Sequence, residues 1–498
     1  MASLILVENT SQAKKLSRLS RAKKIRRVCR GIYTSDLKTP IADIIQKNWM
    51  VITSHIVPNG ILSFRTAIEL KPAVFKNHGI IFITSSYEKR IKLPGLLIKV
   101  LKGDSKNYIE QVLPCIARSN LARALLENLM PTKRGLYKKI KMIDGDSIQH
   151  CLAKELKLRH ETGLNKIRDE SKKIAKKLNY AAAYKKLSII INALLSTHAD
   201  ENILTSPYAK SVVKKEPFDS ARIQLFENLV IYLKQCSFRD RVYEYKKSTF
   251  KNISFFESYF SNFIEGTEFL IDEAEDIVFK REEINHRHAD SHDVLAGFNL
   301  TNDFLDMNST PNNATEFLTI LQNRHAYLMK ERPDKNPGTF KTKPNKVGNT
   351  FFVSPENVIG TLRRGFELMT VLSGGLEKAL FMQFLISEVH PFDDGNGRLS
   401  RIMMNAELVK VNLFKIILPT VCRDNYLNAL RLASRDADFR VYCKVMDQMQ
   451  AYTASIDWKD YGSARTKIEN DYANQSPDEG LAIFNRVLRE LLLSEFAV

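Results

Sequence analysis

Twelve consecutive residues carry side chains of the kinds that are needed to transfer a phosphate-containing group. Residues 390–401 read His-Pro-Phe-Asp-Asp-Gly-Asn-Gly-Arg-Leu-Ser-Arg. The segment holds an imidazole that can accept a proton near neutral pH and a carboxylate suited to Mg²⁺. It also holds two glycines that let the backbone approach an anion, and two guanidinium groups that suit phosphate. Singly, these residues also fit a helix end, a turn and surface charges, but their order in one segment favours catalysis.

Two helices are expected to position this segment. Residues 376–389 carry apolar side chains at helical spacing without Pro or Gly, and residues 402–414 resume an apolar helical pattern. The loop between them then faces the amino terminus of the second helix, where free N–H groups and the helix dipole favour an anion. Arg398 and Arg401 are three residues apart, so both are predicted to extend over the first turn of that helix.

The segment resembles, at every fixed position, the signature of the Fic (filamentation induced by cyclic AMP) family, H-P-F-x-D/E-G-N-G-R-x-x-R. Most Fic proteins transfer AMP from ATP to a hydroxyl side chain of a target protein. The resemblance implies that His390 deprotonates the Ser, Thr or Tyr hydroxyl that attacks the α-phosphate, and that Asp394 holds Mg²⁺. It assigns the remaining contacts as follows: the anion-binding loop to Gly395, Asn396 and Gly397, the β-phosphate side to Arg398, and the γ-phosphate to Arg401.

A second segment, Ser-Asn-Phe-Ile-Glu-Gly at residues 261–266, resembles the inhibitory motif S/T-x-x-x-E-G/N of autoinhibited Fic proteins. Ser261 and Glu265 are four residues apart, on one face of a helix predicted over about residues 256–266. The resemblance implies that Glu265 pairs with Arg401 and displaces the γ-phosphate of ATP. A capped helix end with a solvent-facing glutamate is the alternative.

Residues 338–355 contain two short β-prone runs around a turn of Pro, Asn and Gly, which predicts a hairpin. This hairpin resembles the Fic flap, which pairs with the backbone of the target as an added strand. Strand addition gives affinity through main-chain hydrogen bonds and makes few demands on the sequence of the target. An ordinary surface hairpin is the alternative.

The first half of the chain is strongly basic. The net charge is +19, with about +26 in residues 1–250 and about −7 in the remainder. A short helix is predicted over residues 11–22 and a basic hairpin over residues 24–33, which is the layout of a winged helix on nucleic acid. Residues 26–33 and 60–67, followed by alternating strands near 80–84 and 96–100, resemble the N-terminal domain of AbiEi-type antitoxins, which are transcriptional regulators. DNA binding is therefore expected, with RNA, an acidic protein or a merely solvated surface as alternatives.

We expect a mainly α-helical protein with three domains. Residues 1–115 form a winged-helix-like α/β domain, residues 116–250 a basic helical connector, and residues 251–498 an all-helical Fic domain with a β-hairpin flap. The histidine-rich run at residues 285–293 is expected to be a solvated or locally hydrogen-bonded loop and not a metal site. No apolar run is long enough to span a membrane, and the start lacks a secretory signal. Six scattered cysteines without a Cys-x-x-Cys pair favour a reduced cytoplasmic protein.

The expected function is a Mg²⁺- and ATP-dependent protein adenylyltransferase that is held inactive by Glu265. Its target is a protein with a hydroxyl side chain, and the chain itself is one candidate. Gly395 favours adenylylation, because a related branch that phosphorylates its target tends to carry Ala there. Two alternatives stay open: a DNA-binding or antitoxin-like regulator with a Fic module as sensor, and a deAMPylase in which Glu265 orients water. The sequence does not disclose the target, the DNA sequence or whether the chain forms a homo-oligomer.

Overall fold

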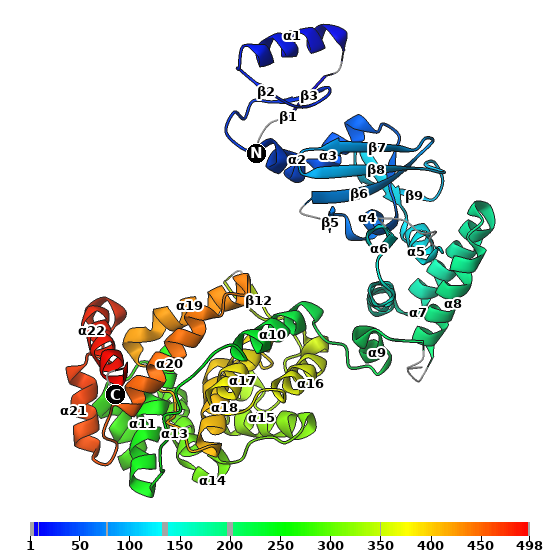
Figure 1. Cartoon of the computed structure of the whole chain (residues 1–498). Coiled ribbons are helices and arrows are strands. Elements are labelled where there is room, and N and C mark those ends of the chain that lie inside the picture. The colour runs from blue at the N-terminus through cyan, green and yellow to red at the C-terminus, as the bar shows by residue number, and fades with distance from the viewer. Residues whose placement is uncertain are drawn as a thin grey trace. The chain divides into compact units, whose positions relative to one another are not determined.

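The computed structural model describes residues 4–7, 9–75, 78–131, 138–196, 203–348 and 350–496. Internal contacts divide the chain into two compact units, residues 1–215 and residues 216–498 (Figure 1). The described chain is mainly helical, as the sequence predicts, and its largest sheet lies in the first unit. The division into three domains, with boundaries after residues 115 and 250, stays a prediction.

A small antiparallel sheet and one helix begin the first unit. Strand β1 (Leu4–Leu6) pairs with β3 (Ile32–Thr34), and β3 pairs with β2 (Arg26–Cys29). Helix α1 (Thr10–Arg21) precedes this hairpin and buries Leu16 against it. The predicted helix and basic hairpin are therefore present. Among the described residues, one helix separates β1 from the hairpin, and the resemblance to a winged helix stays a prediction.

A seven-stranded sheet forms the centre of the first unit, in the order β7-β8-β6-β4-β10-β9 with β5 on β6. Its middle strand β6 is buried over Ile80 to Ser85 because helices cover both faces of the sheet. Helices α2 (Ile41–Lys47) and α3 (Trp49–Ile56) pack on one face, and α4 (Phe64–Glu69) contacts β6 and β10. The strands span Ile61–Leu62 (β4), Ala73–Phe75 (β5), His78–Ser85 (β6), Lys89–Leu93 (β7), Leu96–Lys102 (β8), Ile109–Leu113 (β9) and Ile116–Ser119 (β10).

Helices complete the first unit. The long helix α7 changes direction at His160, whose φ is +55° and ψ −164°, and it packs against α8 along an apolar stripe. Lysine side chains cover the outer faces of both helices, as expected for a basic helical segment. The helices span Leu121–Leu129 (α5), Lys138–Lys141 (α6), Gly145–Leu178 (α7), Ala181–Leu195 (α8) and Pro207–Val213 (α9).

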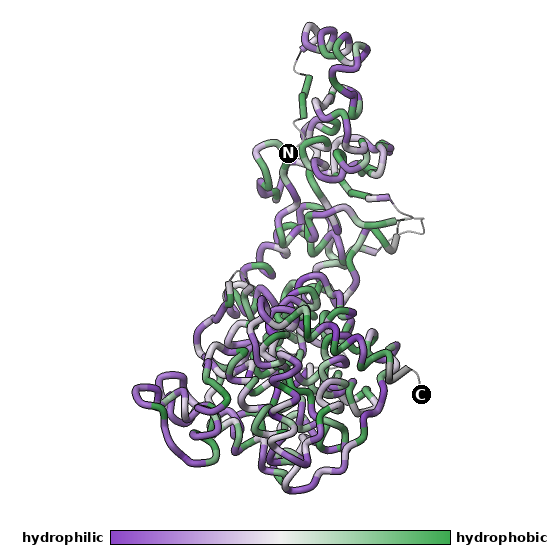
Figure 2. Tube along the Cα trace, turned by 90° about the vertical axis from the view of Figure 1, so that its left-hand side faces the viewer, coloured by the Kyte–Doolittle hydropathy of each residue, from purple (hydrophilic) through white to green (hydrophobic). Residues whose placement is uncertain are grey.

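The second unit is a helical assembly around one continuous apolar core. Helix α17 (Gly375–Val389) is apolar on nearly all sides, and it lies at the centre because α10, α16, α18 and α20 all pack against it (Figure 1). The surrounding helices alternate hydrophobic and hydrophilic residues along their length (Figure 2). They span Ser220–Leu233 (α10), Lys247–Ile264 (α11), Ile271–Glu275 (α12), His288–Asn302 (α13), Phe304–Met307 (α14), Ala314–Leu328 (α15), Val358–Met369 (α16), Asn396–Lys410 (α18), Arg423–Asp436 (α19), Arg440–Ala454 (α20), Tyr461–Asn470 (α21) and Pro477–Phe496 (α22).

Two expectations about local structure are corrected. The helix predicted over residues 256–266 is the last part of the longer helix α11, which starts at Lys247 and ends at Ile264. The polar run at residues 285–293 is a loop only as far as Arg287, because α13 begins at His288. Asp293 in that run is fully buried, so part of a segment that looks solvated in the sequence faces the core. Across the described residues, no helix combines the length and the hydropathy that crossing a membrane requires.

Candidate active site

The predicted helix–turn–helix joint is present between α17 and α18. Helix α17 ends at Val389 and is capped by His390, which adopts the left-handed conformation (φ +49°, ψ +60°), and α18 begins after Gly395 (φ +73°). The Asn396 amide closes the turn: its Oδ1 accepts from Phe392 N–H and its Nδ2 donates to the Phe392 carbonyl, both at 2.9 Å. The side chain of Asn396 is thus hydrogen-bonded within the loop. Its main-chain N–H is the group that can contribute to anion binding.

Gly395 is required for steric as well as conformational reasons. A Cβ atom on this residue would lie 2.7 Å from the Sδ atom of Met329, which is closer than non-bonded atoms approach. The positive φ angle disfavours other residue types in addition. The first glycine of the motif therefore permits the tight turn that directs the backbone toward the start of α18.

Lys341 stabilises the turn between α17 and α18, and the sequence analysis did not identify it as a functional residue. Its buried ammonium group donates to the His390 carbonyl at 2.7 Å, the Val389 carbonyl at 3.3 Å and Asn345 Oδ1 at 2.6 Å. Asn345 Nδ2 in turn donates to the Phe392 carbonyl at 3.0 Å. Burial lowers the pKa of Lys341 to about 8. These bonds hold the main chain on both sides of His390.

His325 on α15 is a second support that sequence analysis missed. Its Nδ1 accepts from Gly338 N–H at 2.8 Å, so Nε2 carries the proton and donates to the Asp394 carbonyl at 3.0 Å. Its ring stacks on Phe392 with centroids 3.7 Å apart. Burial lowers the pKa of His325 to about 4, so the ring is neutral at pH 7. A single histidine inside a helix, as in this chain, carries no signal of such a role.

His390 lies at the edge of a cavity in the second unit. Its ring stacks on Phe352 with centroids 3.9 Å apart and planes within 7°. Burial, and next the positive charge of Lys341, lower the pKa of His390 to about 4. The imidazole is therefore neutral at pH 7 and can accept a proton.

The cavity has a volume of about 660 Å³, which is in the usual range for small-molecule sites of roughly 300–1,000 Å³. Its wall is formed by three residues of the catalytic motif, the end of α11, the hairpin before α16 and one face of α19. Tyr426 on α19 contributes to its wall and is itself buried, with its hydroxyl accepting from Gln383 Nε2 at 2.6 Å. Its lining residues include Glu265, Phe352, His390, Gly397, Arg401 and Tyr426.

Glu265 and Arg401 form the ion pair that the inhibitory resemblance implies. Arg401 Nη2 lies 2.7 Å from Glu265 Oε1, and the guanidinium also donates to the Ser261 side chain at 3.0 Å and to its carbonyl at 2.9 Å. The Arg401 side chain is 4% exposed and that of Glu265 36% exposed. The carboxylate lies against Gly397, because a Cβ there would be 2.0 Å from Glu265 Oε1. It thus occupies space at the first turn of α18, where an anion is favoured.

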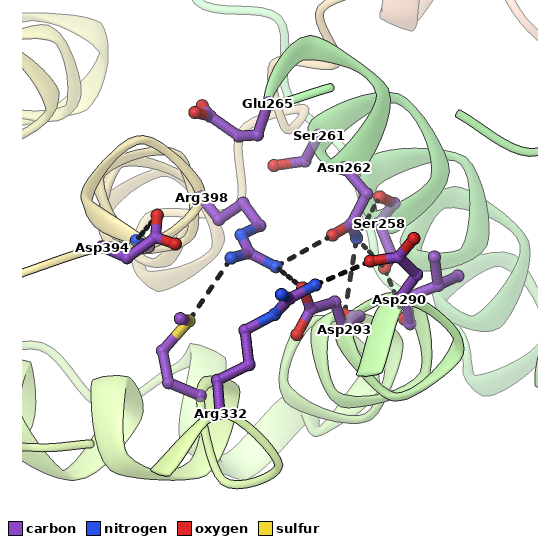
Figure 3. A network of polar contacts seen from close by, with 12 residues as sticks. Ser258, Ser261, Asn262, Glu265, Asp290, Asp293, Arg332, Asp394 and Arg398 are labelled. Carbon is purple, nitrogen blue, oxygen red and sulfur yellow. Dashed lines mark hydrogen bonds and ion pairs between the residues drawn. The ribbon is translucent and has the colours of Figure 1, made fainter. Parts of the chain in front are cut away.

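Arg398 departs from the expectation that both arginines extend over the first turn of α18. Its guanidinium is directed toward α11 and α13, where Nη1 lies 2.6 Å from Asp293 Oδ2 and 3.3 Å from Asn262 Oδ1 (Figure 3). Its Nη2 donates to Met329 Sδ at 3.3 Å. Arg401 lines the cavity, and Arg398 does not. The two side chains diverge because a buried carboxylate on α13 attracts one and the end of α11 binds the other.

Asp394 is exposed at the start of the turn. Its Oδ1 accepts from Gly395 N–H at 2.6 Å, and the carboxylate is otherwise directed away from the core. An exposed carboxylate next to an anion-binding turn fits Mg²⁺, which keeps several water ligands and binds through one or two carboxylates plus phosphate oxygens. The residues present are therefore compatible with the metal that the sequence predicts.

The predicted hairpin is present but shorter than residues 338–355. Its strands are β11 (Lys346–Val347) and β12 (Thr350–Phe351), which pair antiparallel, while residue 349 lies outside the described residues. Residues before β11 follow an irregular path because Lys341 and Asn345 bond to the catalytic turn. Val347 and Phe351 on the two strands are exposed, and Arg222 Nη2 on α10 donates to the Phe351 carbonyl at 3.0 Å.

Part of the chain is similar to known proteins. Residues 317–408 match the model of the Fic/DOC family. The Protein adenylyltransferase Fic of Drosophila willistoni is 26% identical over 199 residues, which cover 39% of this chain and 39% of that protein. The corresponding protein of Drosophila erecta is 24% identical over 199 residues, covering 39% and 40%. The chain thus spans about two fifths of the length of these curated relatives.

Two solved structures are also similar. Fic-1 (residues 134–508) from C. elegans aligns at a TM-score of 0.37 and 16% identity, covering 65% of this chain and 99% of that chain. A Fic domain-containing signalling protein from Bacteroides thetaiotaomicron aligns at 0.37 and 17% identity, covering 49% and 97%. The residues that match the Fic/DOC family model, 317–408, include the whole catalytic motif.

Proposed function

We propose that the protein is a Fic-type adenylyltransferase that transfers AMP from ATP to a Ser, Thr or Tyr hydroxyl of a protein. One observation carries the proposal: His390, Gly397 in the first turn of α18 and Arg401 all line one cavity of about 660 Å³. The names of the curated relatives, each a Protein adenylyltransferase Fic, support the same reaction.

In the proposed reaction, His390 accepts the proton of the target hydroxyl while the hydroxyl oxygen bonds to the α-phosphorus. The bond from the α-phosphorus to the bridging oxygen breaks, and pyrophosphate leaves. The negative charge of bound ATP would raise the pKa of His390 from about 4 toward the range in which a general base works well. Gly395, Asn396 and Gly397 are proposed to form the anion-binding loop, with Asn396 and Gly397 presenting main-chain N–H groups to the phosphates and the Gly395 N–H held by the Asp394 carboxylate.

The two motif arginines are proposed to bind the outer phosphates, Arg398 on the β-phosphate side and Arg401 at the γ-phosphate. Asp394 would hold Mg²⁺, which when bound neutralises charge on the phosphate oxygens. Glu265 is proposed to inhibit the reaction with Ser261 as its neighbour, because its carboxylate occupies both Arg401 and the space above Gly397. A γ-phosphate cannot bind the same guanidinium group until this ion pair opens.

Transfer of radiolabel from α-³²P-ATP tests the proposal directly. His390→Ala should abolish labelling of protein in a lysate or of the chain itself, while Glu265→Gly should increase it. Labelling that persists in the His390→Ala chain would show that the imidazole is not the base. Mass spectrometry of lysate proteins treated with the Glu265→Gly chain would identify the targets by an added AMP.

Target binding by the hairpin of β11 and β12 is part of the proposal. Val347 and Phe351 are 61% and 67% exposed beside the cavity, and exposed strand edges bind extended segments through main-chain hydrogen bonds. Such binding makes few demands on the side chains of the target, so several protein targets are compatible with the site.

Removal of AMP is a second candidate, favoured by the position of Glu265 on the same cavity as His390. The half-exposed carboxylate could orient an attacking water. Incubation of the wild-type chain with an adenylylated protein in the absence of ATP tests this candidate, and release of AMP that is lost in Glu265→Gln would support it.

Nucleic-acid binding by the first unit is a separate proposal. Lysines and arginines on α1 and the following hairpin are exposed, and they include Lys14, Lys15, Arg18, Arg21, Lys24, Arg27 and Arg30. Contacts of this kind to phosphates release counterions, so binding should fall steeply with salt. A gel-shift titration of the full chain at increasing salt, compared with a Lys14→Gln/Arg18→Gln chain, tests the proposal on duplex DNA and on RNA.

A further inference from the structure

One fully buried carboxylate lies between two guanidinium groups outside the cavity. Asp293 Oδ2 is 2.6 Å from Arg398 Nη1 and 2.9 Å from Arg332 Nε (Figure 3). The Asp293 side chain is 1% exposed, that of Arg398 6% and that of Arg332 25%. Asp293 Oδ1 and Arg398 Nε have no hydrogen-bond partner among the described residues. The carboxylate therefore depends on these two arginines for its compensation.

The ion pairs continue outward as a chain of alternating charges. Arg332 Nη2 lies 2.7 Å from Asp290 Oδ1, and Arg287 Nη2 lies 3.2 Å from Asp290 Oδ2. The series Arg398, Asp293, Arg332, Asp290 and Arg287 thus has a cation at each end and a net charge of +1. Removal of Arg332 would leave Asp293 to neutralise Arg398 alone, and Asp290 to neutralise Arg287 alone.

This arrangement bears on phosphate binding at Arg398. A carboxylate with a single cationic partner holds that partner tightly, since a buried unpaired charge is strongly unfavourable. Arg332 binds the same oxygen of Asp293 as Arg398 does. The negative charge of Asp293 therefore stays neutralised when Arg398 also binds a phosphate. Arg332 lies in the turn after α15, outside the motif at residues 390–401 and outside the cavity lining.

We infer that Arg332 is a positioning residue for nucleotide binding, which acts through Asp293 to keep the charge of Arg398 available to the β-phosphate. The inference rests on the proposed function, in which Arg398 binds the β-phosphate side. It predicts a selective effect: loss of Arg332 should weaken the binding of nucleotides that have a β-phosphate and leave the binding of nucleotides without one nearly unchanged.

Calorimetric titration of the full chain with ADP and with AMP, each at the same Mg²⁺ concentration, tests the inference. Arg332→Gln should weaken ADP binding about tenfold, the usual effect of losing one charge-assisted interaction, and AMP binding less than about twofold. Arg332→Lys keeps the charge without the fork of donors, so it should fall between wild type and Arg332→Gln. Lys330→Gln removes an exposed cation two residues away and serves as the matched control.

A double-mutant cycle with Asp293→Asn tests the route of the effect. If Arg332 acts through Asp293, Arg332→Gln should change ADP binding less than about twofold in the Asp293→Asn background. Should the buried substitution prevent folding, the contrast between ADP and AMP in the Arg332→Gln chain still decides. Because Arg332 is partly exposed, its substitution should leave the thermal unfolding transition cooperative.

The outcomes separate this inference from the proposed function. Equal weakening of ADP and AMP, unchanged ADP binding, or an equal loss in Lys330→Gln would overturn the role of Arg332. Failure of His390→Ala to abolish labelling would overturn the reaction without affecting the ADP result. Absence of ADP binding by the wild-type chain would overturn the β-phosphate contact and the inference with it.

Discussion

Substitution of Glu265 by glycine should convert a restrained site into an open one. The ion pair with Arg401 is 2.7 Å long, and the Arg401 side chain is 4% exposed while that of Glu265 is 36% exposed. A hydrogen bond between charged groups contributes about 1.5–3 kcal/mol, which corresponds to roughly 10- to 150-fold in affinity. Because the carboxylate is more than one-third exposed, solvent screening weakens the ion pair. The expected gain in ATP affinity therefore lies at the lower end of this range, about 10- to 30-fold.

Stability should change in the opposite direction. Among the described residues, Glu265 is the one carboxylate that pairs with Arg401, and its loss would leave both bonds to Ser261 in place. The free energy of unfolding is therefore expected to fall by about 1–2 kcal/mol, less than the roughly 3–5 kcal/mol of a fully buried pair that loses one member. The Glu265→Gly chain should be both more active and slightly less stable than the wild type.

The rate of label transfer from α-³²P-ATP, measured against ATP concentration, gives the gain in ATP affinity. Thermal unfolding gives the loss of stability. Glu268→Gly removes an exposed carboxylate three residues later and is the matched control. Equal rates for wild type and Glu265→Gly at every ATP concentration, from well below to well above saturation, would refute inhibition by this residue. A similar gain in Glu268→Gly would show that the flexibility of the glycine, and not the lost ion pair, causes the effect.

Three further perturbations test the supports of the catalytic turn. Lys341→Met removes the bonds to the carbonyls beside His390, and it should lower kcat for AMP transfer about 10- to 100-fold, whereas Lys343→Met at an exposed position should not. Burial lowers the pKa of His325 and His390 to about 4 from 6.5. The unfolded chain therefore binds more protons between these values, and the free energy of unfolding should fall as the pH drops from 6.5 to 4. Urea titrations across that range measure the slope, and an unchanged slope in His325→Gln contradicts the assignment. Gly395→Ala places a Cβ 2.7 Å from Met329 Sδ at a φ of +73° and should cost about 2–4 kcal/mol by thermal unfolding. In contrast, Gly348→Ala, with nothing within 4 Å, should cost only about 1 kcal/mol.

Local sequence was sufficient for the parts of the site that lie close together along the chain. Apolar periodicity over residues 376–389 predicts helix α17, and the glycines and asparagine after it predict the turn. The motif at residues 390–401 indicates the chemistry because its base, carboxylate and guanidinium groups occur in one short segment. The short inhibitory motif, in turn, indicates which carboxylate would reach Arg401.

The tertiary structure alone decided which distant residues complete the site. Lys341, His325 and Asp293 are separated from the motif by about 50 to 100 residues, and none of them stands in a pattern with chemical meaning. Asp293 lies in a polar run that is typical of a solvated segment. Its polar composition does not reveal that α13 directs the Asp293 carboxylate toward the core. The directions of Arg398 and Arg401 likewise depend on what packs beside α18. Local preferences act over a few residues, whereas the pairing of a buried charge is decided by whichever helix lies against it in the folded chain.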